Sequence, residues 1–175
     1  MNTKKLFLFG FVVVGLLVLI LFTLNYYIYK DKHAGFAFDY KDAEYTIEGE
    51  RVKLVGGVAR SKFMLTRYFG NDLAIDLNND GREDKVFLVT QESSGSGIFY
   101  YVLAALNTEE GYIGSDGYFL GDRIAPQTTE VSPNPKHKNV VVINYADRLP
   151  SEPMSTPPSG GKSVYLKIDP NTRQW

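Results

Sequence analysis

An uncharged apolar run near the N-terminus constrains this chain more than any other feature. Residues 6–24 read LFLFGFVVVGLLVLILFTL, 19 residues without a charged side chain. At 1.5 Å rise per residue, a helix of this length covers about 28 Å, close to the hydrocarbon thickness of a bilayer. The run is followed by aromatic and basic residues of the kind found at membrane interfaces: Tyr26, Tyr27, Tyr29, Lys30 and Lys32. We therefore predict a transmembrane helix over residues 6–29.

A cleaved signal peptide is the alternative interpretation of this run. Such peptides have an apolar region of about 7 to 15 residues followed closely by a small-x-small site. The nearest candidate here, Gly35-Phe36-Ala37, lies about ten residues beyond the run, so an uncleaved anchor is favoured. Lysines on both sides leave only a small charge bias. The short tail, residues 1–5, predicts a cytoplasmic N-terminus and a single-pass cell-membrane protein with its C-terminal domain outside the cytoplasm.

The rest of the chain has the pattern of one β-domain. Residues 30–41 are predicted to be a linker, and residues 42–175 have the size of a single domain. Twelve tyrosines and eleven phenylalanines in the whole chain favour strands over helices. Alternating or apolar segments bounded by turn residues occur at 43–47, 52–54, 73–77, 86–90, 98–106, 118–120, 128–131, 140–145 and 164–168, and residues 62–69 are ambiguous between strand and helix. About eight short strands predict a mainly β fold, an antiparallel sandwich or open barrel preceded by the transmembrane helix.

Residues 43–54 are predicted to form a hairpin that turns at Gly49-Glu50. Two other segments are predicted to form the hairpin at the centre of the sheet. Residues 86–90 and 98–106 are apolar without alternation, which is typical of strands covered on both faces. Residues 150–161 (PSEPMSTPPSGG) contain four prolines and two glycines and are predicted to form a long surface loop.

Composition excludes several classes of function. Outside the membrane segment the chain is mildly acidic and has no basic stripe, so nucleic acid is not expected as a partner. The chain has no cysteine, hence no disulfide, thiolate metal site or cysteine nucleophile. Nucleotide is not expected either, because Gly161-Lys162-Ser163 resembles only the end of a phosphate-binding loop and no helix follows.

One group of residues has the spacing of a metal-binding loop. The segment from Asp76 to Asp84 (DLNNDGRED) places side-chain oxygens at loop positions one, three, five and nine, with glycine at six. Calcium requires six to eight oxygens, and alternate residues of such a loop converge on one ion. Position twelve is Phe87 where an EF-hand has glutamate, and a strand follows instead of a helix. An Asx-rich hairpin turn is the alternative that needs no metal.

The pattern DxNxDGxxD between two strands resembles the calcium loop of FG-GAP and VCBS repeats. That resemblance implies a structural Ca²⁺ with Asp76, Asn78, Asp80 and Asp84 as side-chain ligands and Arg82 as a backbone ligand. More widely, the stretches DLNNDGREDKVFL, SGSGIFYYVLAAL, LGDRIAPQTTE and VVINYADRLPSEPM resemble a family of uncharacterised bacterial exported or membrane-anchored proteins. This second resemblance implies a cell-envelope location and no particular activity.

Other candidate sites are weaker. Asp122-Arg123 and Asp147-Arg148 each follow a predicted strand and could line a site for an anionic or sugar ligand, although pairing across strands or turn capping is the favoured explanation. Adjacent residues of a strand point to opposite faces, so neither dipeptide is expected to form an ion pair within itself. A wall-polymer hydrolase is one alternative function, with Asp122, Asp147 and Glu152 as candidate carboxylates. An inhibitor or sensor of a wall-degrading enzyme is another, acting through residues 93–97 or 150–161. No catalytic set is predicted.

The sequence therefore predicts a membrane-anchored extracytoplasmic domain that is stabilised by one Ca²⁺. Its function is expected to be structural, or binding of an envelope protein or polymer.

Overall fold

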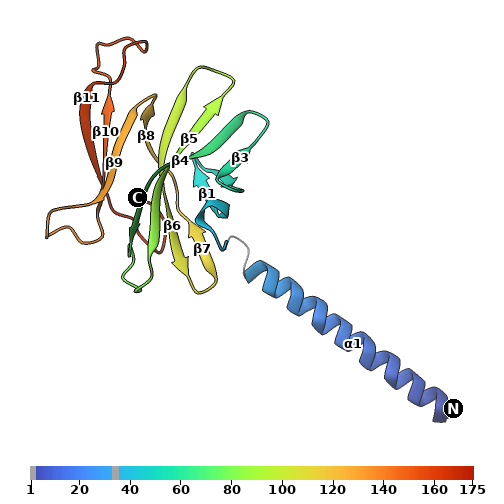
Figure 1. The fold of residues 1–175 in the computed structure, drawn as a ribbon. Helices are drawn as coiled ribbons and strands as arrows, with labels where there is room; N and C mark the ends of the chain where they lie inside the picture. The colour runs from blue at the N-terminus through green and yellow to red at the C-terminus, as the bar shows by residue number, and fades with distance from the viewer. Residues whose placement is uncertain (1–2, 33–35) are drawn as a thin grey trace. The chain divides into compact units, whose positions relative to one another are not determined.

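The computed structural model describes residues 3–32 and 36–175, and in the N-terminal helix it describes the side chains of residues 12–27. The chain divides into two units, residues 1–34 and 35–175. The first contains a single long helix, α1 (Thr3–Lys32), drawn in blue in Figure 1. Within the described part of the chain, no helix combines the length and the hydropathy that a membrane crossing requires. The side chains of residues 6–11, 28 and 29 of the predicted span, and those of Lys30 and Lys32, lie outside the described set.

The second unit is mainly β, as predicted, and its described residues form eleven strands in place of the eight expected. The strands are β1 (Glu44–Ile47), β2 (Glu50–Lys53), β3 (Val58–Arg60), β4 (Met64–Ile75), β5 (Asp84–Ser93), β6 (Ile98–Thr108), β7 (Gly111–Gly114), β8 (Tyr118–Asp122), β9 (Ala125–Val131), β10 (Val141–Asp147) and β11 (Gly160–Leu166). A short 3-10 helix, η1 (Tyr40–Asp42), precedes them.

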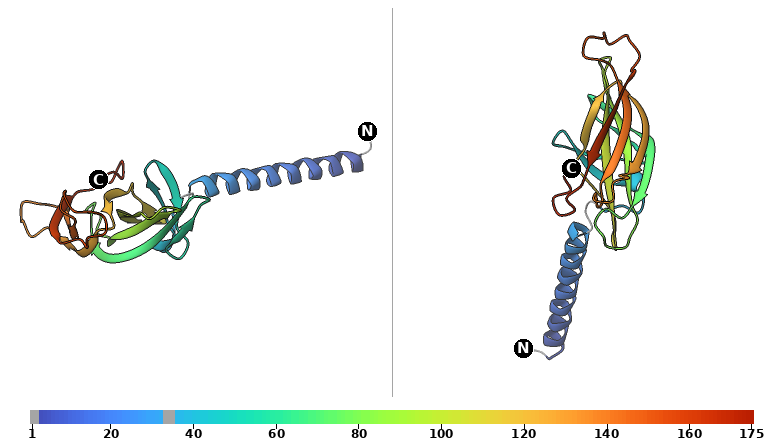
Figure 2. Two further views of the ribbon diagram at one scale, coloured as in Figure 1. Left: turned by 90° about the horizontal axis from the view of Figure 1, so that it is seen from above. Right: turned by 90° about the vertical axis from the view of Figure 1, so that its left-hand side faces the viewer.

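The strands form three antiparallel sheets in layers (Figures 1 and 2). The central sheet has the order β3-β4-β5-β6-β7, and β8 pairs with β6 beyond the end of β7. The hairpin β1-β2 covers one face of this sheet, and the three-stranded sheet β11-β10-β9 covers the other. The result is a sandwich in which the central sheet has a layer on each side.

Burial follows directly from this layering. In β5, Phe87 and Val89 face the β1-β2 hairpin, whereas Val86 and Leu88 face the sheet β11-β10-β9. All four side chains have no exposed surface. The prediction that the apolar runs at 86–90 and 98–106 form the doubly covered centre of the sheet is confirmed, because they lie in β5 and β6.

The first hairpin is also where the sequence places it. Glu48 and Gly49 connect β1 to β2 with positive φ angles of 52° and 79°. This is the conformation of a two-residue turn that matches the twist of the flanking strands, and glycine adopts it without strain. The turn residues are Glu48-Gly49, one position earlier than the predicted Gly49-Glu50.

Four further details differ from the expectation. The segments 62–69 and 73–77 belong largely to one strand, β4, whose pairing with β5 shifts register around Gly70. Strands β3 and β7 were not predicted, because each has only three or four residues and little apolar pattern. Gly160 and Gly161 start β11, so the predicted loop 150–161 ends earlier. In the predicted linker, Ala37 exchanges two backbone hydrogen bonds with Tyr112, which places residues 37–41 in the β unit.

Candidate functional site

The predicted calcium loop connects β4 to β5. Asn79 and Gly81 have φ angles of 62° and 84°, so the backbone turns sharply within a few residues. The two carboxylate oxygens of Asp76 accept hydrogen bonds from the N–H groups of Asp80 (3.2 Å) and Gly81 (2.9 Å). The side chain at the first loop position is therefore folded into the turn.

The next two predicted ligands point into the same turn. The Asn78 Oδ1 atom accepts from the N–H of Asp80 at 2.9 Å, and Asp80 Oδ1 accepts from the N–H of Arg82 at 2.8 Å. The Arg82 N–H bond is the main cause that holds the pKa of Asp80 below its usual value, with contributions from the Asn78 amide and the Arg82 guanidinium. The oxygens of Asp76 and Asn78 share one donor, so they lie close together.

Asp84, the last predicted side-chain ligand, is fully buried. One carboxylate oxygen accepts from the N–H of Leu77 at 2.9 Å and the other from the N–H of Asn107 at 2.7 Å. Burial raises the pKa of the Asp84 carboxyl; these two bonds lower it, and the nearby charges of Asp80 and Asp76 raise it further. Among the described residues, no Lys, Arg or His side chain forms an ion pair with Asp84.

Arg82 is predicted as a backbone ligand, and its side chain has a role of its own. The guanidinium lies 3.2 Å from Asp80 Oδ2 and 2.9 Å from Glu109 Oε1. It links the loop to the turn between β6 and β7. The structure thus brings all five predicted residues into one loop of oxygen donors, while no group of three or more Asp, Glu, His or Cys side chains in the described residues converges in a metal-binding geometry.

The two Asp-Arg dipeptides meet at the ends of β8 and β10. The Arg148 guanidinium donates to the carbonyl oxygen of Arg123 at 2.9 Å. Asp122 and Arg123 form an ion pair at 3.1 Å, although neighbouring strand residues were expected to point to opposite faces. That expectation is wrong here because Arg123 leaves the strand with a φ of 50°. Asp147 pairs instead with Lys162 on β11, at 2.7 Å.

The carboxylates proposed for a hydrolase are engaged in local structure. Burial would raise the pKa of Asp122, but hydrogen bonds from Arg123 and from the Ile98 N–H outweigh it and lower the pKa. The hydrogen bond from Lys162 lowers the pKa of Asp147. Glu152 accepts from the N–H of Leu149 within a turn. A general acid needs a raised pKa, so the lowered pKa values of Asp122 and Asp147 do not favour either of them as the acid of a hydrolase.

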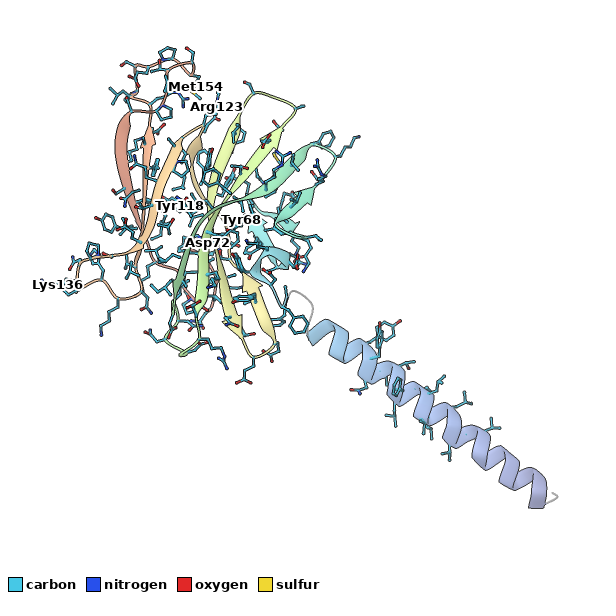
Figure 3. The ribbon with its side chains drawn as sticks, in the orientation of Figure 1. Tyr68, Asp72, Tyr118, Arg123, Lys136 and Met154 are labelled. Carbon is cyan, nitrogen blue, oxygen red and sulfur yellow. The ribbon has the colours of Figure 1, made fainter. Side chains whose placement is uncertain are left out.

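Sequence reasoning missed a tyrosine cluster on the outer part of β4. The hydroxyl groups of Tyr40 and Tyr68 both donate to Asp72 Oδ2, at 2.7 and 2.8 Å, and Figure 3 labels Tyr68 and Asp72 side by side. The Lys41 ammonium lies 3.8 Å from the centroid of the Tyr68 ring. Burial, followed by the hydrogen bond to Asp72, raises the pKa of Tyr40. The cluster fastens η1 to the irregular part of β4.

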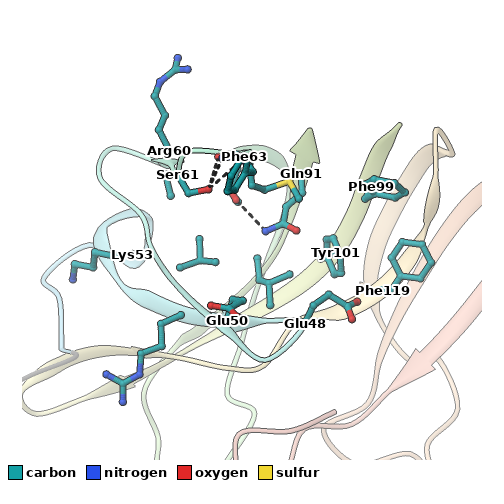
Figure 4. A pocket seen from close by; sticks show the side chains of 16 residues that line it. Glu48, Glu50, Lys53, Arg60, Ser61, Phe63, Gln91, Phe99, Tyr101 and Phe119 are labelled. Atoms are coloured by element: carbon teal, nitrogen blue, oxygen red, sulfur yellow. Dashed lines mark hydrogen bonds between the residues drawn. The ribbon is translucent and has the colours of Figure 1, made fainter. Parts of the chain in front are cut away.

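A cavity of about 750 Å³ was also missed (Figure 4). It lies between the β1-β2 hairpin and β3, and the central sheet forms its floor. Its volume is within the range of small-ligand pockets. Only the alternation that places Gln91 and Thr66 on one face with Phe99 and Tyr101 could have indicated it, because the walls come from separate segments of the chain.

Comparison of the chain with protein-family models, with curated proteins and with solved structures gave no match. The resemblance of the loop to FG-GAP and VCBS repeats, and the wider resemblance to bacterial envelope proteins, therefore stay predictions.

Proposed function

We propose that this chain is a non-enzymatic, membrane-anchored binding protein of the cell envelope, whose β-domain is stabilised by one Ca²⁺ in the loop between β4 and β5. The observation that carries the metal site is the buried Asp84 carboxylate without a cationic partner among the described residues. An uncompensated buried carboxylate is costly, and a bound cation supplies the missing charge.

The donor set of the loop fits a hard cation. Asp76, Asn78, Asp80 and Asp84 offer only oxygen, as does the backbone carbonyl of Arg82, and calcium prefers oxygen ligands. Each of the carboxylates keeps lone pairs beyond the hydrogen bonds that fold the turn. Water molecules would complete the coordination. The ion would hold the start of β5 to the end of β4, so its role would be structural.

The membrane anchor rests on the uncharged run at residues 6–24, which lies within α1. Apart from Thr23, residues 12–24 of this helix are glycine or apolar on every side. A helix that is apolar all round requires an apolar environment.

Calorimetric titration of the full chain in detergent micelles with CaCl₂ tests the metal site. Wild type is compared with Asp80→Ala, and Glu130→Gln is the matched control because Glu130 is an exposed carboxylate on β9, outside the loop. We expect binding at one site in wild type and in the control, a raised melting temperature in both, and neither effect in Asp80→Ala. Absence of binding by wild type at millimolar calcium would reduce the loop to an Asx turn and remove the metal from the proposal.

A further inference from the structure

The β2-β3 hairpin separates into two strands almost as soon as it forms. Val55 and Val58 exchange two backbone hydrogen bonds, at 2.9 and 3.1 Å, across the turn at Gly56-Gly57. Beyond this bridge the strands diverge, since among the described residues β2 pairs with β1 alone and β3 with β4 alone. The cavity lies in the resulting gap (Figure 4). Its two sides are therefore strand edges.

The edge on β2 is open. Leu54 donates its N–H to the carbonyl of Ala43, which fixes the alternation of bonded and non-bonded pairs along the β1-β2 hairpin. In that alternation Arg51 and Lys53 direct their backbone N–H and C=O groups away from β1. Among the described residues, these groups have no backbone partner. The side of β2 that borders the cavity thus presents a row of unused donors and acceptors.

The edge on β3 is open in the same way. Tyr68 donates to the carbonyl of Gly57, and Ser61 donates to that of Met64, so the residues between them alternate inward and outward. Arg60 is an outward residue, and its backbone groups have no backbone partner within the described chain. Unpaired strand edges of this kind are templates for a strand from another chain.

The floor between the two edges is mainly aromatic. Phe99, Tyr101 and Phe119 line it, with ring centroids of neighbouring pairs 5.4 to 6.3 Å apart. Phe119 is 47% exposed, whereas Tyr101 beside it is 5% exposed. This is a surface that accepts one large apolar side chain.

A buried side-chain amide adds a polar group to the floor of the cavity. Gln91 is 6% exposed and donates to the Thr66 hydroxyl at 3.1 Å. Gln91 also lines the cavity, and Figure 4 shows its side chain beside the aromatic residues. Its amide oxygen can accept a hydrogen bond from an occupant, which favours one that carries N–H groups as well as apolar side chains.

Basic side chains flank the opening. Lys53 and Arg60 form no ion pair among the described residues, and Arg51 contacts only Glu44, at 3.5 Å. All three residues are exposed. Two acidic residues, Glu48 and Glu50, also line the cavity, at the turn end of the β1-β2 hairpin. The free positive charges at the strand edges complement acidic residues on an occupant.

We propose that the gap between β2 and β3 binds an extended peptide segment of a partner protein, which adds to the β2 edge as a strand. One large apolar residue of the segment enters the aromatic floor, and acidic residues beside it contact Lys53 and Arg60. Backbone hydrogen bonds supply affinity in this mode, and the pocket for the alternate side chain supplies specificity. The inference rests on the proposed role as a binding protein and does not depend on calcium.

The test uses the full chain in micelles and a blocked pentapeptide with a central phenylalanine, a valine on each side and a glutamate at each end. Its matched control is the same peptide with the nitrogens of the phenylalanine and of both valines methylated, which blocks both of its strand edges. NMR titration follows the amide signals of Arg51, Lys53 and Arg60. We expect saturable binding of the first peptide that shifts these signals, and binding at least tenfold weaker for the methylated one.

A proline variant isolates the strand edge without disturbing the fold. Lys53→Pro removes an N–H that β1 does not use, and proline is compatible with an edge strand. We expect its melting temperature to stay near that of wild type while peptide affinity falls at least tenfold. Lys53→Gln keeps the N–H and controls for the lost charge. Its loss of peptide affinity relative to wild type should be smaller and should vanish at high salt.

Three results would overturn the proposal. Equal binding of both peptides, or unchanged binding in Lys53→Pro, would show that no strand is added. Self-association of wild type that Lys53→Pro abolishes would make a second copy the occupant. Absence of peptide binding together with chitotriose binding at Phe119 would indicate a sugar site. Every titration is made in calcium and in chelator, so loss of peptide binding with calcium binding intact removes only this inference.

Discussion

Replacement of Asp84 by asparagine separates the two roles of the β4–β5 loop, the hairpin turn and the cation site. Asparagine has nearly the same shape but one carbonyl oxygen, so it can accept from only one of the N–H groups of Leu77 and Asn107. A buried donor left without an acceptor costs about 1–3 kcal/mol. In chelator, removal of an uncompensated buried charge offsets part of this cost. We therefore expect a small net destabilisation in the absence of calcium.

Calcium should increase the difference in stability between wild type and Asp84→Asn. A ligand that binds only the folded state stabilises it by about 2.7 kcal/mol when present at 100 times its dissociation constant. Wild type gains this free energy and Asp84→Asn does not, so the difference in free energy of unfolding should grow by about 2.7 kcal/mol on addition of calcium. Urea unfolding monitored by fluorescence of Trp175, the single tryptophan, which packs against the core, measures it.

The pH dependence of the stability gives an independent test. Burial raises the pKa of Asp84 in the folded state, so without a cation its folded form binds a proton more readily than the unfolded form. The stabilisation that protonated Asp84 contributes is complete below its pKa in the unfolded state. It is lost as the pH rises through the raised pKa of the folded state. In chelator, the stability of wild type relative to Asp84→Asn should therefore decrease with rising pH. A difference that is the same in calcium and chelator and flat with pH would refute the reasoning.

Three further outcomes follow from the fold. Gly114→Ala should destabilise the domain by about 1–3 kcal/mol in urea unfolding, because the added methyl group would overlap the Glu44 carbonyl and the Tyr45 ring; Gly161→Ala, with open space, is the control. Tyr68→Phe should cost about 0.5–1.5 kcal/mol by loss of the bond to Asp72, with a similar loss in Asp72→Asn and no additivity between them. Introduction of Val14→Arg with Leu17→Arg should release the chain from carbonate-washed membranes, since each arginine costs about 2.5–3.5 kcal/mol at a helix centre; retention would argue against the anchor.

The predictable part of this fold comes from patterns that are local. Strand β5 was recognisable because its residues 86–90 are apolar without alternation, which only a doubly covered strand requires. The turn at Glu48-Gly49 was recognisable within one residue because few residue pairs accept two positive φ angles. The calcium-type loop could also be recognised from the sequence, because its oxygen donors are spaced along nine consecutive residues.

Other features depended on contacts between distant segments. Asp84 is buried beside the neighbouring strand β6, whose Asn107 N–H donates to its carboxylate. The ion pair of Asp122 with Arg123 depends on a backbone angle at the end of β8, and Arg148 joins them from β10. Short strands such as β3 have too few residues for a periodic signal and form because β4 is there to pair with them.

The sequence by itself determined the apolar N-terminal run, the β class, the central hairpin and the oxygen-rich loop, because hydrophobic period and turn chemistry act over a few neighbouring residues. Only the tertiary structure decided the three-layer arrangement, the burial of the Asp84 carboxylate and the separation of β2 from β3. These features depend on which strand each edge meets, and that is fixed by packing between segments far apart in the chain.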